Sequence, residues 1–177
     1  MVPVMFGSLR TFFWYLAGEV DPRTEADDHN CRLVTAALLT RVATVHSEMS
    51  EVRRKALYTI VQSRFGLDDR ATERLLDEAA ALNSDAIDLY HFTRQLNEIL
   101  NHDGRRQVVQ MMWEVVYADG QANEYDTNII WRAADLLGVS SRQRVELRQQ
   151  VFAERAAFSQ VCSVLPQSAA LAPTAGK

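Results

Sequence analysis

Three carboxylates lie close together in one short segment of the chain, at Asp119, Glu124 and Asp126. The same segment contains Gly120, which permits a left-handed turn, and Asn123, a residue favoured just before a helix. We therefore expect one helix to end near Asp119 and another to begin at Glu124. Negative charge in a first helical turn is favourable by about 0.3–1 kcal/mol. Glu124 and Asp126 thus have a structural explanation that needs no ligand.

Asp119 is expected at the C-terminal end of a helix, where the helix dipole disfavours an anion. Backbone N–H groups of the turn, an arginine or a metal ion must compensate its charge. If Asp119, Glu124 and Asp126 converge, their oxygens suit Ca²⁺ or Mg²⁺, with Zn²⁺ less favoured. The segment is not an EF-hand, because its glycine stands at the second loop position rather than the sixth. A structural turn and a metal site both stay open at this point.

An earlier part of the chain reads like the part that contains these acids. In the alignment of the two parts, Ser50 matches Asn123, and each copy reads as helix, tight turn, helix, glycine stop and helix. Chance similarity between helical segments is the alternative explanation. Because a unit of this kind cannot bury its apolar faces alone, we expect two degenerate pseudo-repeats, about 33–82 and 105–155, to pack around one core.

Apolar residues recur at helical spacing along most of the chain, and no segment alternates in the manner of a strand. No proline interrupts the chain between Pro22 and Pro166. Glycines are expected at turns between helices, and those of this interval are Gly66, Gly104, Gly120 and Gly138. Plausible N-caps are Asp68, Asp85, Asn123 and Ser140. The sequence predicts an all-α protein, a compact bundle of about seven to eight helices.

The two ends of the chain differ from the middle. We interpret the N-terminal segment as an amphipathic helix packed on the body, because its apolar stretch at 11–18 is far shorter than the roughly 20 residues that span a bilayer. Contact with a membrane surface is the less favoured alternative. We expect residues 1–165 to form one domain and residues 166–177, which are small and turn-forming, to be disordered.

Composition and motifs exclude several classes of function. The net charge of −4 argues against a nucleic-acid-binding protein. Cys31 and Cys162 lie far apart in the sequence, which favours a reducing, cytoplasmic location. The sequence contains no HExxH pair, nucleophile elbow or glycine-rich phosphate loop. We therefore assign no catalytic or organic-cofactor residues and expect a protein that is not an enzyme.

At the acidic turn the sequence resembles the TerB-like family, named for tellurite-resistance proteins. The resemblance rests on 117–120 (Tyr-Ala-Asp-Gly), 124–126 (Glu-Tyr-Asp) and 130–137, with a weaker first copy at 42–54. It implies an all-helical fold and a divalent-cation site, with only Asp119, Glu124 and Asp126 qualifying as ligands. It also implies a link to metal, tellurite or stress responses in bacteria, without established catalysis.

The first copy departs from the family pattern, because His46-Ser47 replaces Asp-Gly and Arg53 stands where an acidic residue is expected. A second metal site is therefore in doubt. His46, Glu48 and Glu51 offer donors for a transition metal, although a solvated turn is the favoured interpretation.

Two classes of function follow from these residues. The first is a non-enzymatic cation-binding or scaffold module that works with partner proteins in a stress response. The second is a metal-free protein–protein interaction module that uses an exposed apolar helix face, such as the one at 12–14 (Phe-Phe-Trp), to bind an unidentified partner or a second copy.

Overall fold

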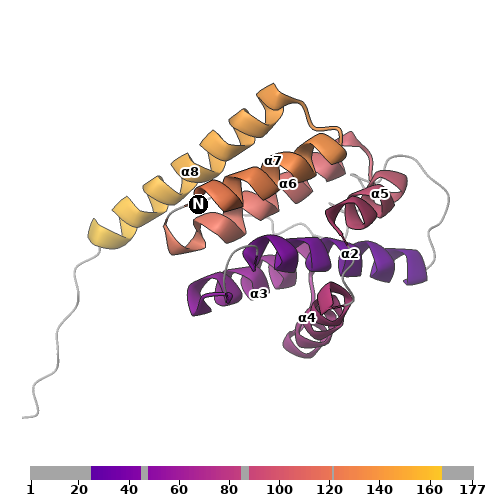
Figure 1. Cartoon of the computed structure of the whole chain (residues 1–177). Helices are drawn as coiled ribbons and strands as arrows, with labels where there is room; N and C mark the ends of the chain where they lie inside the picture. The colour runs from indigo at the N-terminus through magenta and orange to yellow at the C-terminus, as the bar shows by residue number, and fades with distance from the viewer. Residues whose placement is uncertain (1–24, 45–47, 85–87, 121, 165–177) are drawn as a thin grey trace, which may run out of the picture.

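The computed structural model describes residues 25–44, 48–84, 88–120 and 122–164. The predicted N-terminal helix, the tail 166–177, His46 and Asp85 lie outside these ranges. Within them the chain forms helices alone, which confirms the predicted all-α class (Figure 1). In chain order these are α2 (Glu25–Ala43), α3 (Glu51–Phe65), α4 (Asp69–Ser84), α5 (Leu89–Ile99), α6 (His102–Val116), the 3₁₀ turn η1 (Tyr117–Asp119), α7 (Glu124–Leu136) and α8 (Ser141–Val164).

The two central helices, α2 and α6, carry most of the core. In α2 an almost continuous run from Val34 to Ala43 is buried, and in α6 the side chains of Met112 and Trp113 are fully enclosed. Helix α2 packs on α3 and α4, and α6 packs on α7 and α8. The succession α2–α3–α4 is thus repeated by α6–α7–α8, as the pseudo-repeat predicts. Because α2 also contacts α6, the two copies share one core.

Local sequence explains where the helices begin. Asp68 accepts a hydrogen bond from the backbone N–H of Ala71 at 2.7 Å, and Ser140 Oγ accepts one from Gln143 at 3.3 Å. Both therefore cap helices as predicted. The cap of α5 is Asp88, whereas the sequence suggested Asp85.

Glycine ends α3 and follows α7, but it does not end every helix. Gly66 and Gly138 have φ values of 62° and 70°, which L-residues with a side chain rarely adopt. The expectation for Gly104 is wrong, because Gly104 lies in the first turn of α6, after the cap Asn101. A Cβ at Gly104 would stand 3.2 Å from two side-chain atoms of Leu100. Close packing against the preceding residues, rather than a left-handed turn, accounts for this glycine.

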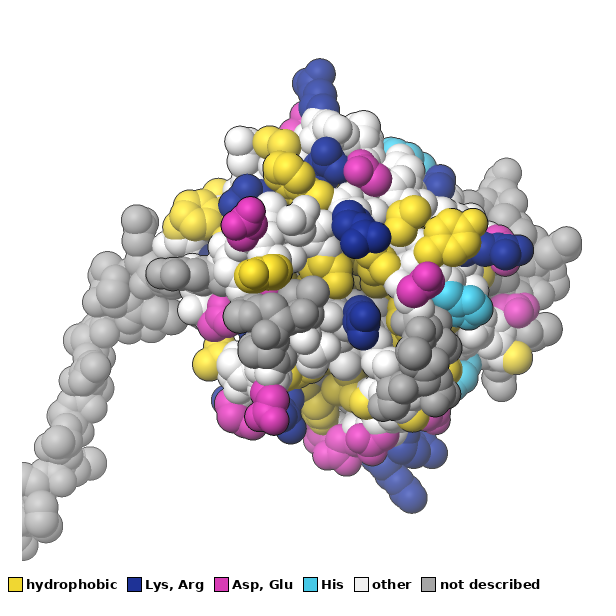
Figure 2. Space-filling model, viewed as in Figure 1, with side chains coloured by type: hydrophobic (Ala, Val, Ile, Leu, Met, Phe, Trp, Pro, Cys, Tyr) yellow, Lys and Arg dark blue, Asp and Glu magenta, His cyan; other side chains and the backbone are white. Residues whose placement is uncertain are grey.

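Both signs of charge and hydrophobic side chains are intermixed on the face shown in Figure 2. Among the described helices, none combines the length and apolar character needed to cross a membrane.

Candidate functional site

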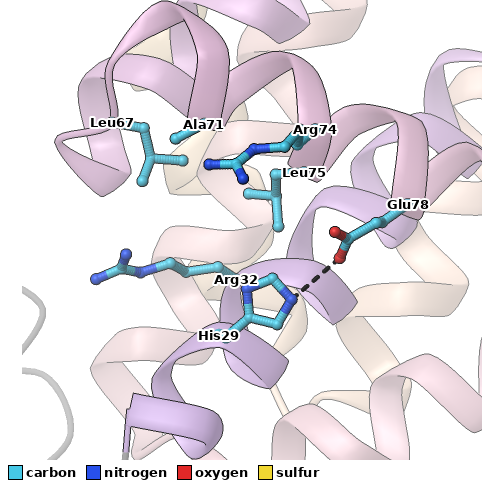
Figure 3. A pocket seen from close by; sticks show the side chains of 7 residues that line it. All are labelled: His29, Arg32, Leu67, Ala71, Arg74, Leu75 and Glu78. Carbon is cyan, nitrogen blue, oxygen red and sulfur yellow. Dashed lines mark hydrogen bonds and ion pairs between the residues drawn. The ribbon is translucent and has the colours of Figure 1, made fainter.

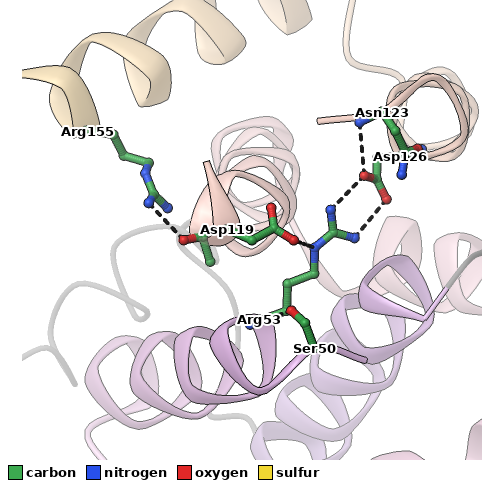
Figure 4. Close-up of polar contacts among 7 residues, drawn as sticks. Ser50, Arg53, Asp119, Asn123, Asp126 and Arg155 are labelled. Atoms are coloured by element: carbon green, nitrogen blue, oxygen red, sulfur yellow. Dashed lines mark hydrogen bonds and ion pairs between the residues drawn. The ribbon is translucent and has the colours of Figure 1, made fainter. Parts of the chain in front are cut away.

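The predicted acidic turn lies where the two copies meet. Helix α6 continues into η1, which ends at Asp119, and Gly120 then adopts a φ of 93°. The chain reverses there and enters α7 behind Asn123. Helix α3 packs against both α6 and η1. Its first turn faces the acidic turn. Side chains from the start of α3, from η1 and from the start of α7 therefore face one another (Figure 4).

Arg53 of α3 connects these three elements. Its Nε donates a hydrogen bond to Asp119 Oδ2 at 2.8 Å. Its two terminal nitrogens donate to the two carboxylate oxygens of Asp126, with Nη1–Oδ1 at 3.0 Å and Nη2–Oδ2 at 2.7 Å. The contact with Asp126 is bidentate, which is the strongest geometry for an arginine–carboxylate pair. We call the group Arg53, Asp119 and Asp126 the arginine clasp (Figure 4).

Asp126 is held in place by its own helix. Its backbone N–H donates to Asn123 Oδ1 at 2.8 Å, and its Oδ2 accepts from the backbone N–H of Asn123 at 3.2 Å. This is a complete capping box, although aspartate is shorter than the glutamate usual at this position. The capping box fixes the carboxylate of Asp126 so that both its oxygens face the guanidinium of Arg53.

Arg53 is oriented in the same way at the start of α3. Ser50 caps this helix, and its Oγ accepts a hydrogen bond from the backbone N–H of Arg53 at 3.2 Å. Arg53 and Asp126 thus occupy the same third helical position in their respective copies. The two pseudo-equivalent residues carry opposite charges and bind each other.

The clasp is largely excluded from water. Asp126 is 0 % exposed and Arg53 is 7 % exposed, whereas 31 % of the Asp119 side chain is accessible. The hydrogen bonds from Arg53 to Asp126 raise the pKa of the guanidinium above its ordinary value. Burial of Arg53 acts in the opposite direction, and the hydrogen bond to Asp119 raises the pKa further. Arg53 is therefore a permanent cation. Two carboxylates against one guanidinium leave the clasp with a formal charge of −1, located at its accessible end.

Helix α8 supports the turn from the opposite side. Arg155 Nη2 donates to the carbonyl oxygen of Ala118 at 2.9 Å (Figure 4). Arg148 Nε donates to the hydroxyl of Tyr117 at 2.8 Å, and its guanidinium lies over the ring of Trp113. These contacts engage the C-terminal end of α6 and η1, where positive charge is favourable.

The structure brings two of the three predicted metal ligands together. Asp119 and Asp126 converge on Arg53, whereas Glu124 is exposed at the first position of α7. Among the described residues, no group of three or more His, Cys, Asp or Glu side chains is placed to hold a metal ion. In the first copy, Glu51 Oε1 lies 3.5 Å from Arg54 Nε.

Sequence reasoning missed the position of Arg53 in the site. The sequence indicated that the charge of Asp119 needs a compensating group, and an arginine was one of the options. Arg53 itself was interpreted only as a departure from the family pattern, which has an acidic residue at this position. The information that could have identified it was the repeat alignment. That alignment places a cation in one copy opposite an anion in the other at a position where the copies share a core.

Comparison with known proteins places the chain in context. The family model described as tellurite resistance protein TerB matches residues 32–149, which is more than half of the chain. The match runs from α2 into α8 and includes all three residues of the clasp. No curated protein and no solved structure matches the chain.

Proposed function

Since this chain belongs to the tellurite resistance protein TerB family, we propose that it is a non-enzymatic helical interaction module in which Arg53, rather than a divalent ion, neutralises the acidic turn. One observation carries this proposal. Arg53 donates three hydrogen bonds to Asp119 and Asp126, so the two predicted ligands already share a cation supplied by the other copy.

The chemistry of the clasp supports a metal-free site. A Ca²⁺ ion requires six to eight oxygen ligands, but both oxygens of Asp126 already accept hydrogen bonds. An ion that bound both carboxylates would have to displace Arg53. The guanidinium would then stay buried without its partners, which is strongly unfavourable.

Two exposed apolar side chains flank the clasp and suit an interaction surface. Val52 is 53 % exposed and Tyr125 is 66 % exposed, and they precede Arg53 and Asp126 directly. The acidic residues Glu51 and Glu124 stand beside them at the first helical positions, and both are exposed. Aromatic side chains are favoured at interfaces, whereas the charges beside them are mixed, because Arg54 and Lys55 are also exposed. We propose that this surface binds a partner protein through apolar side chains.

The first experiment is a thermal melt of the full chain in EDTA and then with Ca²⁺, Mg²⁺, Mn²⁺ and Zn²⁺ in turn. An ion that binds only the native state must raise the midpoint in a saturable manner. We expect no saturable rise with any ion. A saturable rise that Asp119→Ala abolishes would overturn the metal-free proposal and favour the cation site at Asp119, Glu124 and Asp126.

The interaction surface is tested by crosslinking in cells with a tagged chain, recovered in EDTA. We expect a discrete adduct that Val52→Ser combined with Tyr125→Ser removes. The matched control is Tyr90→Ser, because the exposure of Tyr90, 59 %, lies between those of Val52 and Tyr125, but Tyr90 lies on α5. An adduct lost in the control and kept in the double variant would reject this surface. Sedimentation of the purified chain tests the alternative that the partner is a second copy.

The name of the family favours a second candidate function, in tellurite or metal stress. We propose that the interaction surface serves this response. A tellurite-sensitive bacterial strain that expresses the chain should survive higher tellurite concentrations, and the Val52→Ser, Tyr125→Ser variant should lose this gain. Equal survival of strains with the unmodified chain and with the double variant would show that the interaction surface does not serve the tellurite response.

A further inference from the structure

A cavity of about 250 Å³ lies between α2 and α4 and shares no residue with the clasp. Helix α2 provides Arg32 and His29, and helix α4 provides Arg74 and Glu78 (Figure 3). The cavity is slightly smaller than the typical 300–1,000 Å³ of small-molecule sites. Its size therefore suits a small molecule rather than a folded segment of a partner.

Positive charge dominates the polar part of this cavity. Its acidic residue, Glu78, already accepts a contact from His29, with Nε2 and Oε2 3.0 Å apart. Arg32 and Arg74 have no salt bridge within the described part of the chain. The two guanidinium groups extend from facing helices along the same cavity (Figure 3). With Glu78 counted, the two guanidinium groups leave the cavity lining with a net formal charge of +1, which favours an anion.

The rest of the lining is apolar. Leu67, Ala71 and Leu75 line the cavity on the α4 side, and Leu75 is nearly completely buried. A fully hydrated inorganic anion gains nothing from such a wall, whereas an organic anion buries its hydrocarbon part there. Arginine is also the side chain best suited to carboxylate and phosphate, because its planar fork donates two parallel hydrogen bonds.

We propose that this cavity is a binding site for a small organic anion. Its carboxylate or phosphate head lies between Arg32 and Arg74, and its short apolar body lies against Leu67, Ala71 and Leu75. The Glu78–His29 contact closes one side of the site and keeps the carboxylate of Glu78 from competing with the ligand for the arginines.

The test is calorimetric titration of the full chain with hexyl phosphate, hexanoate and inorganic phosphate, at concentrations up to about 10 mM. We expect saturable binding of at least one alkyl anion, about tenfold tighter than that of inorganic phosphate. Arg32→Gln and Arg74→Gln should each weaken it about tenfold or more. Arg70→Gln is the matched control, because Arg70 is exposed on α4 and does not line the cavity.

Three results would overturn the proposal. The first is the absence of saturable binding by every probe. The second is alkyl-anion binding that neither arginine substitution weakens in variants whose melting midpoints match the unmodified chain. The third is binding of inorganic phosphate that is as tight as the binding of the alkyl anions. The apolar wall would then have no part in recognition. Comparison of hexyl phosphate with hexanoate identifies which head group the site takes.

Discussion

The starts of α3 and α7 are built alike and differ at one decisive position. Ser50 and Asn123 each cap their helix by accepting a hydrogen bond from the third helical residue. That residue is Arg53 in one copy and Asp126 in the other. Because the copies face each other across a shared core, opposite charges at equivalent positions become partners. The comparison shows how opposite charges at equivalent positions let one copy supply the counter-charge that the other copy lacks.

The copies also contribute unequally to the clasp. The second copy supplies both carboxylates and the first supplies the single guanidinium. A second ion pair between the copies, Arg64 of α3 with Glu114 of α6 at 2.6 Å, is more exposed, with 27 % and 20 % of the two side chains accessible. The buried pair should therefore matter much more to stability than the half-buried pair.

The largest expected effect comes from removing one partner of the buried pair. Arg53→Ala leaves the enclosed carboxylate of Asp126 without its cation, and loss of one partner of such a pair destabilises by about 3–5 kcal/mol. Urea unfolding followed by circular dichroism measures this change. The control is Arg54→Ala, which breaks an exposed pair with Glu51 and should change stability by less than about 0.5 kcal/mol. Equal effects of the two substitutions would contradict the difference drawn between buried and exposed pairs.

Metal ions should act on the Arg53→Ser variant and leave the unmodified chain unaffected. The substitution frees the carboxylates of Asp119 and Asp126 from the guanidinium, so a divalent ion can take its place. At an ion concentration ten times the dissociation constant, the gain would be about 1.4 kcal/mol. Melts of both forms in EDTA and in each ion measure it. An ion that stabilises the two forms equally would show that Arg53 does not block the site.

The helix caps provide a finer comparison of the two copies. Asn123→Ala removes a cap and also loosens Asp126, so we expect a loss of about 1–2 kcal/mol, near the upper end of cap effects. Ser50→Ala removes only the bond to the backbone of Arg53 and should cost about 0.5–1 kcal/mol. Urea midpoints of the two variants, measured together, decide the order. A larger loss for Ser50→Ala would show that the capping box does not position Asp126.

The smallest effect is a change in pH dependence at the half-buried pair. Burial raises the pKa of Glu114 above its ordinary value of 4.5, while Arg64 and a hydrogen bond from Gln110 oppose the rise. The folded state therefore binds this proton more readily than the unfolded state, and this contribution to stability declines as the pH rises above about 4.5.

Glu114→Gln removes this titration. The variant should gain stability relative to the unmodified chain between pH 5 and pH 7, by less than about 1 kcal/mol. Urea midpoints at the two pH values test it. A relative loss over this interval would mean that Arg64 outweighs burial and lowers the pKa.

Much of the fold could be predicted from local features, because several helix starts and glycine stops are encoded within a few residues. Asn123, Asp68 and Gly66 are examples. Gly104 was misjudged because its role is a close contact with Leu100, and spacing alone does not distinguish a turn glycine from a packing glycine. Asp119 and Asp126 converge on Arg53, and the metal site predicted at these residues stays a prediction.

Arg53 stands 66 residues before Asp119 and 73 before Asp126 in the chain. The contact depends on how α3 packs against α6 and η1, which no local pattern encodes. The sequence could show that Asp119 needs a counter-charge, whereas only the packing of the two copies shows which residue provides it.

The most direct test is a double-mutant cycle on Arg53 and Asp126, with urea unfolding of the unmodified chain, Arg53→Ala, Asp126→Ala and the double variant. If Arg53 is the cation of the acidic turn, the double variant loses much less stability than the sum of the single losses. We predict a coupling energy of about 2–3 kcal/mol when the cycle is measured in EDTA. Additive losses would contradict this role for Arg53.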